Sequence, residues 1–406
     1  MPESVGEAIS ELSKPLQASE SESDASIPFS LGQLCLYFLR LGTFGFGGPI
    51  ALVGYMQRDL VERRNWISEQ DYREGLALAQ LAPGPLAAQL AIYLGWVRAR
   101  VLGATLIAFA FIAPSFLMVL AISAFYVRFG TLSWMQGAFY GIGAAVIAII
   151  IRSAIKLTRV TLARDRLLWL IFGVNALITA TTESEIVWTF LLSGIVALLV
   201  KAPPRLRSKS LPVFSILPAW LLSGLHGPAP GSAIWKIGLY FAEAGAFVFG
   251  SGPAIVPFLH GGVVERYGWL TDRQFLDAVA VAMITPGPVV ITVAFIGYLV
   301  AGLVGATVAA LGVFLPCYLF VIIPAPYFRQ IAKNLRVKAF VNGVTAAATG
   351  AIAGSVVVLG RRAIVDVPTI LILVGTYLVL AKSKKVPEPL VILTTGVIGL
   401  AVSYAR

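Results

Sequence analysis

The chain has 406 residues, of which 58% are hydrophobic and 13% are charged, and its mean hydropathy is +0.85. This composition excludes a water-soluble globule, which needs more polar surface, and it predicts an all-α integral membrane protein with many spans. The net charge of +11 comes from Lys and Arg at the ends of apolar runs. Such a placement orients spans and argues against nucleic-acid binding.

Four segments follow one another along the chain. Residues 1–28 are polar and acidic and lack the apolar core of a cleaved signal, so we expect a disordered tail. Residues 29–209 form a first transporter repeat, residues 210–231 an apolar linker span, and residues 232–406 a second repeat. These bounds follow from an internal match at an offset of about two hundred residues.

Matching motifs carry the duplication. "FGFGGP" at Phe44 corresponds to "FVFGSGP" at Phe247, and "VERRNW" at Val61 corresponds to "VERYGW" at Val264. "APGP" in the first half corresponds to "TPGP" in the second. The loop that holds only Arg128 matches a second-half loop with several Lys and Arg. Because cytoplasmic loops are rich in these residues, we predict two inverted structural repeats of about six membrane helices each, with the N-terminus cytoplasmic and the C-terminus periplasmic.

Each half has an apolar run that is interrupted by a PGP motif. Proline removes an amide donor and disfavours helix before it, so each run becomes two broken half-helices, with the second proline first in the new helix. The free amides and positive dipole end then suit an anion. A plain packing kink is the alternative. The predicted binding residues are Gln80, Pro83, Gly84, Pro85 and Gln89 in the first half, and Thr285, Pro286, Gly287, Pro288 and Thr292 in the second.

A glycine-rich turn precedes each PGP motif. Glycine allows a backbone to approach a ligand closely, and proline suits the start of the following helix. The candidate residues are Gly47, Gly48 and Pro49 in the first half and Gly250, Ser251, Gly252 and Pro253 in the second.

Charged residues at matched positions complete the candidate site. Arg40 and Glu243 lie within apolar runs, where a charge costs at least about 2.5 kcal/mol. Either they form a structural ion pair with each other, or Arg40 binds an oxyanion and Glu243 carries a proton. Glu62, Arg63, Glu265 and Arg266 are gating candidates, with interface anchoring as the alternative. The two histidines and two cysteines form no metal or nucleophile pattern, so we expect neither an enzyme nor a cofactor.

The two motif blocks resemble those of the chromate ion transporter family of bacterial membrane proteins. "FGFGGPIALVGYMQRDLVERRNW" with "LAPGPLAAQ" is similar to the first signature of that family, and "FGSGPAIVPFLHGGVVERYGW" with "ITPGPV" to the second. The resemblance implies chromate efflux through the inner membrane, driven by the membrane potential or by protons, and chromate resistance. It also implies that the motif residues of the first half, from Arg40 to Gln89, bind the ion.

Several alternatives stay open at this stage. A sulfate or other oxyanion permease could use the same scaffold, because sulfate shares the charge and shape of chromate. A passive anion channel is a third reading. The partners expected are chromate, sulfate as a second oxyanion, protons and the lipid bilayer, and a homodimer is compatible with the pattern.

Overall fold

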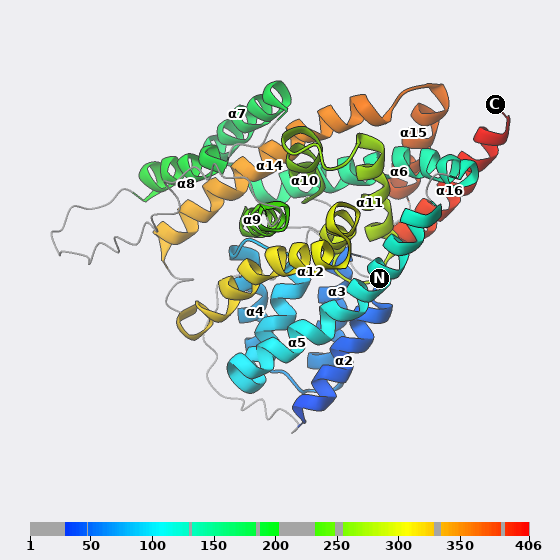
Figure 1. Ribbon diagram of the computed structural model, residues 1–406. Helices are drawn as coiled ribbons and strands as arrows, with labels where there is room; N and C mark the ends of the chain where they lie inside the picture. The colour runs from blue at the N-terminus through cyan, green and yellow to red at the C-terminus, as the bar shows by residue number, and fades with distance from the viewer. Residues whose placement is uncertain are drawn as a thin grey trace.

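The computed structural model describes residues 29–46, 48–129, 132–183, 187–202, 232–247, 255–328, 334–382 and 386–405, and these are helices and connecting turns (Figure 1). The expected N-terminal tail, the linker span, Gly47 and residues 250–253 lie outside this part of the chain.

The helices of each half follow the same order. In the first half they are α2 (Leu31–Phe44), α3 (Gly48–Met56), the π-helical η1 (Gln57–Arg63), α4 (Glu69–Leu81), α5 (Leu86–Phe129), α6 (Ser133–Leu162), α7 (Arg166–Thr182) and α8 (Val187–Lys201). In the second half they are α9 (Ser232–Phe247), α10 (Ile255–His260), the π-helical η4 (Gly261–Arg266), α11 (Asp272–Ile284), η5 (Val289–Ile291), α12 (Thr292–Ile322), η6 (Ala325–Tyr327), α14 (Leu335–Ala363), α15 (Val367–Lys382) and α16 (Glu388–Ala405).

The first half begins with two helical hairpins that open towards the same end. Phe29 stacks on Trp66 with ring centroids 5.1 Å apart, and Arg98 donates a hydrogen bond of 2.7 Å to the Phe29 carbonyl. The start of α2, the end of η1 and the first part of α5 therefore meet. At Ala99 and Arg100 the backbone leaves helical geometry, and the rest of α5 runs on as a long apolar helix.

The PGP motif lies at the tip of the second of these hairpins. The sequence did not indicate that the chain reverses its direction there. Gly84 has φ of +134°, and the chain turns back so that α5 packs along α4. A Cβ at Gly75 would lie 2.4 Å from Tyr93 Cδ1 across the hairpin. The expected place of Pro85 is wrong by one residue: its carbonyl accepts from the Gln89 amide at 3.0 Å, so Pro85 caps α5 instead of beginning it. Pro288 likewise caps η5.

The second half repeats these conformations at matched positions. Gly287 has φ of +102°, and the backbone of α12 leaves helical geometry at Ala301 and Gly302. Both halves also carry a π-helical turn that runs into the motif that ends in tryptophan. A duplicated chain architecture accounts for this agreement.

The two halves interlock through their last helices. α14 packs along α7 and α8, α6 packs along α15 and α16, and α5 crosses α12 (Figure 1). Glycine permits close approach here: a Cβ at Gly141 of α6 would lie 2.1 Å from the Thr395 carbonyl oxygen of α16, and one at Gly350 of α14 would lie 2.3 Å from that of Phe172. Small residues of this kind let helix backbones touch in membranes.

Four of the described helical segments are long and apolar enough to cross a membrane: Leu86–Phe129, Trp134–Leu162, Val289–Tyr327 and Leu335–Ala363. Shorter apolar helices accompany them, and the result is an all-α, multi-pass membrane protein, as the composition predicts.

Replacing Gly141 by Ala tests this interlock. The added methyl group meets a backbone carbonyl, and we expect a loss of about 1–3 kcal/mol in stability. Gly173→Ala in α7 is the matched control, because nothing lies within 4 Å of its Cβ position. Thermal unfolding of the detergent-purified variants measures the effect. Equal melting temperatures for the two variants would contradict this packing.

Candidate functional site

The first PGP turn is closed by a side chain of its own half. Gln89 in the first turn of α5 is fully buried, and its Nε2 donates a hydrogen bond of 2.5 Å to the Pro83 carbonyl. This brings the carboxamide over Gly84, where a Cβ would lie 2.6 Å from Nε2. The Cys317 thiol of α12 lies on the same glycine, 2.9 Å from that Cβ position. The turn is therefore covered by the long helix of the other half.

The second PGP turn has the reciprocal environment. The Gly287 amide donates to the Gly45 carbonyl at 3.1 Å, and Ser115 Oγ of α5 would lie 1.9 Å from a Cβ at Gly287. Ser115 and Cys317 occupy matched positions, and they donate to the Gly42 and Gly245 carbonyls at 3.3 and 3.6 Å. Each PGP turn thus rests on the long helix of the opposite half.

The glycine-rich turn of the first half belongs to the same centre. Gly48 has φ of +73°, a conformation that favours glycine, and Pro49 is the second residue of α3. Gly45, three residues earlier, holds the second PGP turn. The structure therefore joins two motifs that the sequence places in different halves.

The two PGP turns differ in exposure. Gln80 is exposed and residues 81–83 are half-buried, whereas every residue from Thr285 to Thr292 is buried. The hydroxyls of Thr285 and Thr292 donate to the Val281 and Val289 carbonyls at 2.6 and 2.7 Å. Two of the predicted polar ligands in the second half are thus already engaged by their own backbone.

Arg40 and Glu243 are not paired with each other. Arg40 is exposed on α2, and within the described ranges no ion pair includes it. Glu243 instead lies near Arg266, whose charge acts on it. The structural pair considered from the sequence is therefore wrong for this conformation.

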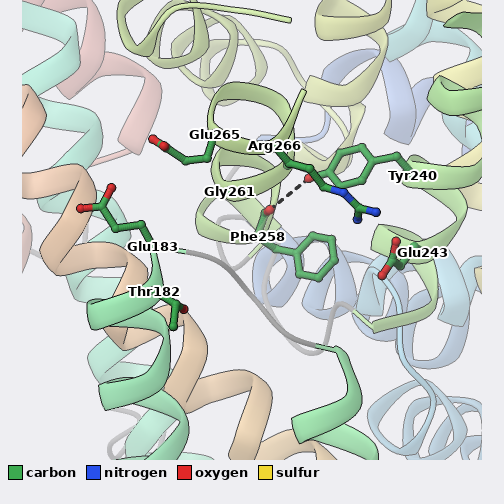
Figure 2. Close-up of a pocket in the computed structure, with 9 residues that line it drawn as sticks. Thr182, Glu183, Tyr240, Glu243, Phe258, Gly261, Glu265 and Arg266 are labelled. Carbon is green, nitrogen blue, oxygen red and sulfur yellow. Dashed lines mark hydrogen bonds between the residues drawn. The ribbon is translucent and has the colours of Figure 1, made fainter. Parts of the chain in front are cut away.

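Glu243 and Arg266 face a cavity of about 340 Å³ between α7, α9, α10 and η4. Figure 2 shows the Arg266 guanidinium pointing towards Glu243, while Tyr240 donates to the Phe258 carbonyl at 3.1 Å. Thr182, Glu183 and Glu265 line another part of the wall. The cavity therefore contains two of the predicted gating residues and the predicted proton carrier.

An ion-pair network on Arg362 lies beside this cavity. The guanidinium of Arg362, near the end of α14, pairs with Glu183, Glu265 and Asp272, and Asp272 also meets His260 Nε2 at 2.7 Å. Burial alone raises the pKa of the Asp272 carboxyl, but the hydrogen bonds from His260 and Arg362 outweigh it and hold that pKa below its ordinary value. Glu265 could be predicted as a gating residue from its motif, whereas its partner Arg362 could not, because the two are 97 residues apart.

The counterparts of this network in the first half pair only locally. Arg63 lies 3.6 Å from Asp59, and Glu69 lies 2.5 Å from Arg73, each within one helical turn. Glu62 has no ion pair in the portion described. Of these two matched sets of described residues, only the one in the second half forms a network that joins several elements.

His260, Glu265 and Asp272 also lie close enough together to hold a metal ion, with ligand atoms within 4.8 Å of one another. The Arg362 guanidinium already engages both carboxylates and supplies the compensating charge. We therefore interpret the cluster as an ion-pair network.

Comparison with known proteins agrees with the sequence motifs. The family described as "Chromate transporter" matches twice, over residues 32–198 and 235–400. The chain is 59% identical to a chromate transport protein of Cupriavidus metallidurans, over 92% of this chain and 93% of that one. It is 58% identical to a probable chromate transport protein of Synechococcus elongatus, over 92% and 95%. No solved structure is significantly similar.

Interlocked halves with paired PGP turns define a duplicated, multi-pass helical membrane protein. The chain belongs to the chromate transporter family. Its relatives are named transport proteins, which accords with the expectation of transport and not catalysis.

The Arg362 network predicts a change in access to the cavity. Arg362→Gln leaves three carboxylates without their counter-charge, so we expect a Cys at position 243 to react about five- to tenfold faster with a membrane-impermeant maleimide. The background carries Cys35→Ser and Cys317→Ser. Arg361→Gln is the control, because the neighbouring Arg361 forms none of these ion pairs. Unchanged labelling in Arg362→Gln would remove the network from any gating role.

Proposed function

We propose that this chain exports chromate across the bacterial inner membrane as a secondary active transporter and so confers chromate resistance. The reciprocal packing of the two PGP turns on α12 and α5 carries the proposal, because interrupted helices buried at the junction of two halves form the substrate sites of many transporters. The names of two relatives supply the substrate.

An inverted relation of the two halves is supported by the ends at which their hairpins open. The first-half hairpins meet Arg98, just before the long part of α5 begins. The second-half hairpin meets the other end of that helix and the start of α6: Tyr126 of α5 donates to Asp277 at 2.6 Å, and Arg273 donates to the Gln136 carbonyl of α6 at 3.0 Å. Combined with the Lys and Arg distribution, this supports a periplasmic position for the Arg362 network.

Export agrees with the electrical driving force. A dianion that leaves a negative-inside cell releases about 4.6 kcal/mol at roughly 100 mV, whereas uptake needs more than two cotransported cations. Inward protons exchanged for outward chromate add to this force. Glu243 is the proposed proton carrier, because it lines the cavity and faces Arg266.

The unequal exposure of the two PGP turns supports an alternating-access mechanism. The first PGP turn is partly exposed, while the second is buried behind the end held by Arg362. Glu62, Arg63, Glu265 and Arg266 are the proposed gate residues at the two ends. In the opposite state, the second turn becomes exposed and the first is covered.

Flux measurements in oriented vesicles test the proposal against its alternatives. Chromate export that saturates and responds to imposed pH and voltage gradients supports it. Vesicles that accumulate sulfate and ignore chromate would establish an oxyanion permease, and non-saturating flux that ignores a collapsed proton gradient would establish a passive channel.

Arg40→Ala is expected to abolish chromate flux. The guanidinium is the motif cation in the apolar run of α2, and its loss removes the donor fork for an oxyanion. Arg73→Ala is the control, because Arg73 is exposed and its ion pair among the described residues is with Glu69 of its own helix. Vesicle flux and membrane content are measured for both. Wild-type flux in Arg40→Ala would disprove the anion role.

Glu243→Gln is expected to uncouple transport from the pH gradient. Downhill chromate exchange persists, whereas the acceleration by an outside-acid gradient is lost, because the amide cannot carry a proton. Glu69→Gln serves as the control for a carboxylate outside the cavity. Retained stimulation by the pH gradient in Glu243→Gln would exclude this carboxylate as the carrier.

A further inference from the structure

The carboxamide of Gln89 has a fixed orientation. Its Nε2 donates to the Pro83 carbonyl at 2.5 Å, and a carbonyl can only accept. Rotating the amide would place two acceptor oxygens against each other, so Oε1 must occupy the other position. Gln89 is 0% exposed, and in the described part of the chain its Oε1 has no donor. A buried acceptor without a partner is rare and points to a missing donor.

Donors without acceptors lie on the same turn. α5 begins at Leu86 with Pro85 as its cap, so the amides of Leu86, Ala87 and Ala88 have no carbonyl in a preceding helical turn. Among the described residues, no hydrogen bond joins these amides to another segment. They form the positive end of a helix and suit the oxygens of an anion. The first PGP turn therefore offers amide donors and one buried acceptor together.

The second PGP turn lacks this combination. Thr292, at the position matched to Gln89, donates its hydroxyl to the Val289 carbonyl at 2.7 Å. The amides of Ile291 and Thr292 are bonded within η5. Among the described residues, no side-chain atom of this turn is buried without a hydrogen-bond partner, in contrast to Gln89 Oε1.

We propose that the first PGP turn binds a tetrahedral oxyanion in its singly protonated form. The hydroxyl of the anion donates to Gln89 Oε1, and its remaining oxygens accept from the amides at the start of α5. This inference rests on the proposed function and deepens it, because it names the protonation state of the substrate and the residue that selects it.

The acid–base chemistry of the two ions allows this acceptor to discriminate chromate from sulfate. Chromate takes up a proton near neutral pH, whereas sulfate does so only in strong acid. A sulfate dianion in the same place sets a lone pair against the Gln89 oxygen, and that oxygen stays unsatisfied. Charge and shape alone do not separate the two ions, but a required hydroxyl does. The bound ion carries one negative charge where the dianion carries two, so the membrane potential still favours its export, but with half the electrical driving force.

Among the described residues, few titratable groups near Gln89 could produce a pH dependence that imitates protonation of the ligand. From α12, the Cys317 thiol lies against Gly84 and donates to the Val313 carbonyl at 3.0 Å. From α4, the Glu74 carboxylate lies 3.5 Å from the Tyr93 hydroxyl, one turn farther along α5. Titration of such protein groups would change the binding of both chromate and sulfate with pH. A pH effect that is confined to chromate would come from protonation of the chromate itself.

Equilibrium binding to the full-length protein in lipid nanodiscs tests the proposal, with chromate and sulfate as probes between pH 6 and pH 8.5. In the wild type we expect the ratio of chromate to sulfate affinity to rise as pH falls, by up to about tenfold per pH unit in the alkaline part of the range. Gln89→Met keeps the volume and removes the acceptor. It should lower chromate affinity at pH 6 by about three- to tenfold and flatten the pH dependence of the ratio.

Gln70→Met is the matched control, because it makes the same chemical change on the exposed first turn of α4. A wild-type ratio that is independent of pH would overturn the inference and leave an ordered water as the donor to Oε1. A ratio that rises with pH, or a folded Gln89→Met protein with the wild-type pH dependence, would overturn it as well. If chromate binds but the ratio of chromate to sulfate affinity does not change with pH, this inference fails and the proposed function is retained. If only sulfate binds, both the inference and the proposed function fail.

Discussion

An unpaired backbone group inside a bilayer must be covered by protein, and this constraint governs the centre of the molecule. Each PGP motif interrupts a helix and frees amides and carbonyls at its tip. The long helix of the opposite half provides the cover: α12 lies on Gly84 and α5 on Gly287. Only glycine allows that approach, because a Cβ at either position meets a side-chain atom of the other half. Neither half can therefore complete the centre alone.

Duplication produced two similar backbones with unequal side chains. Positive φ at Gly84 and Gly287 and the breaks near residues 99 and 301 are shared. The hydrogen bonding of the matched side chains differs between the halves. The Thr292 hydroxyl donates to a backbone carbonyl of its own turn, whereas Gln89 Oε1 has no donor among the described residues. The ion pairs of Arg362 also tie α14 to the end of α7, to η4 and to α11. In the proposed mechanism this inequality separates one access state from the other and assigns substrate selection to the first half.

Local chemistry made much of the fold predictable. Proline and glycine act on their own and adjacent residues, so the positions of both PGP breaks could be identified from the motifs. The direction of the chain after each break could not, because a PGP turn is compatible with a continued helix or with a hairpin. The packing of Tyr93 against Gly75 decides for the hairpin. The role of Arg362 could not be predicted either, because its partner Glu183 is 179 residues away in the sequence.

By itself, the sequence determined the membrane class, the duplication, the family motifs and the residues at which the helices break. Hydropathy and backbone restriction are local properties, and they need no knowledge of neighbours in space. The tertiary structure alone decided which way the half-helices run, that Arg40 and Glu243 stay apart, and how the Gln89 carboxamide is oriented. These features depend on contacts between groups that come together only when the chain folds, and no local pattern encodes them.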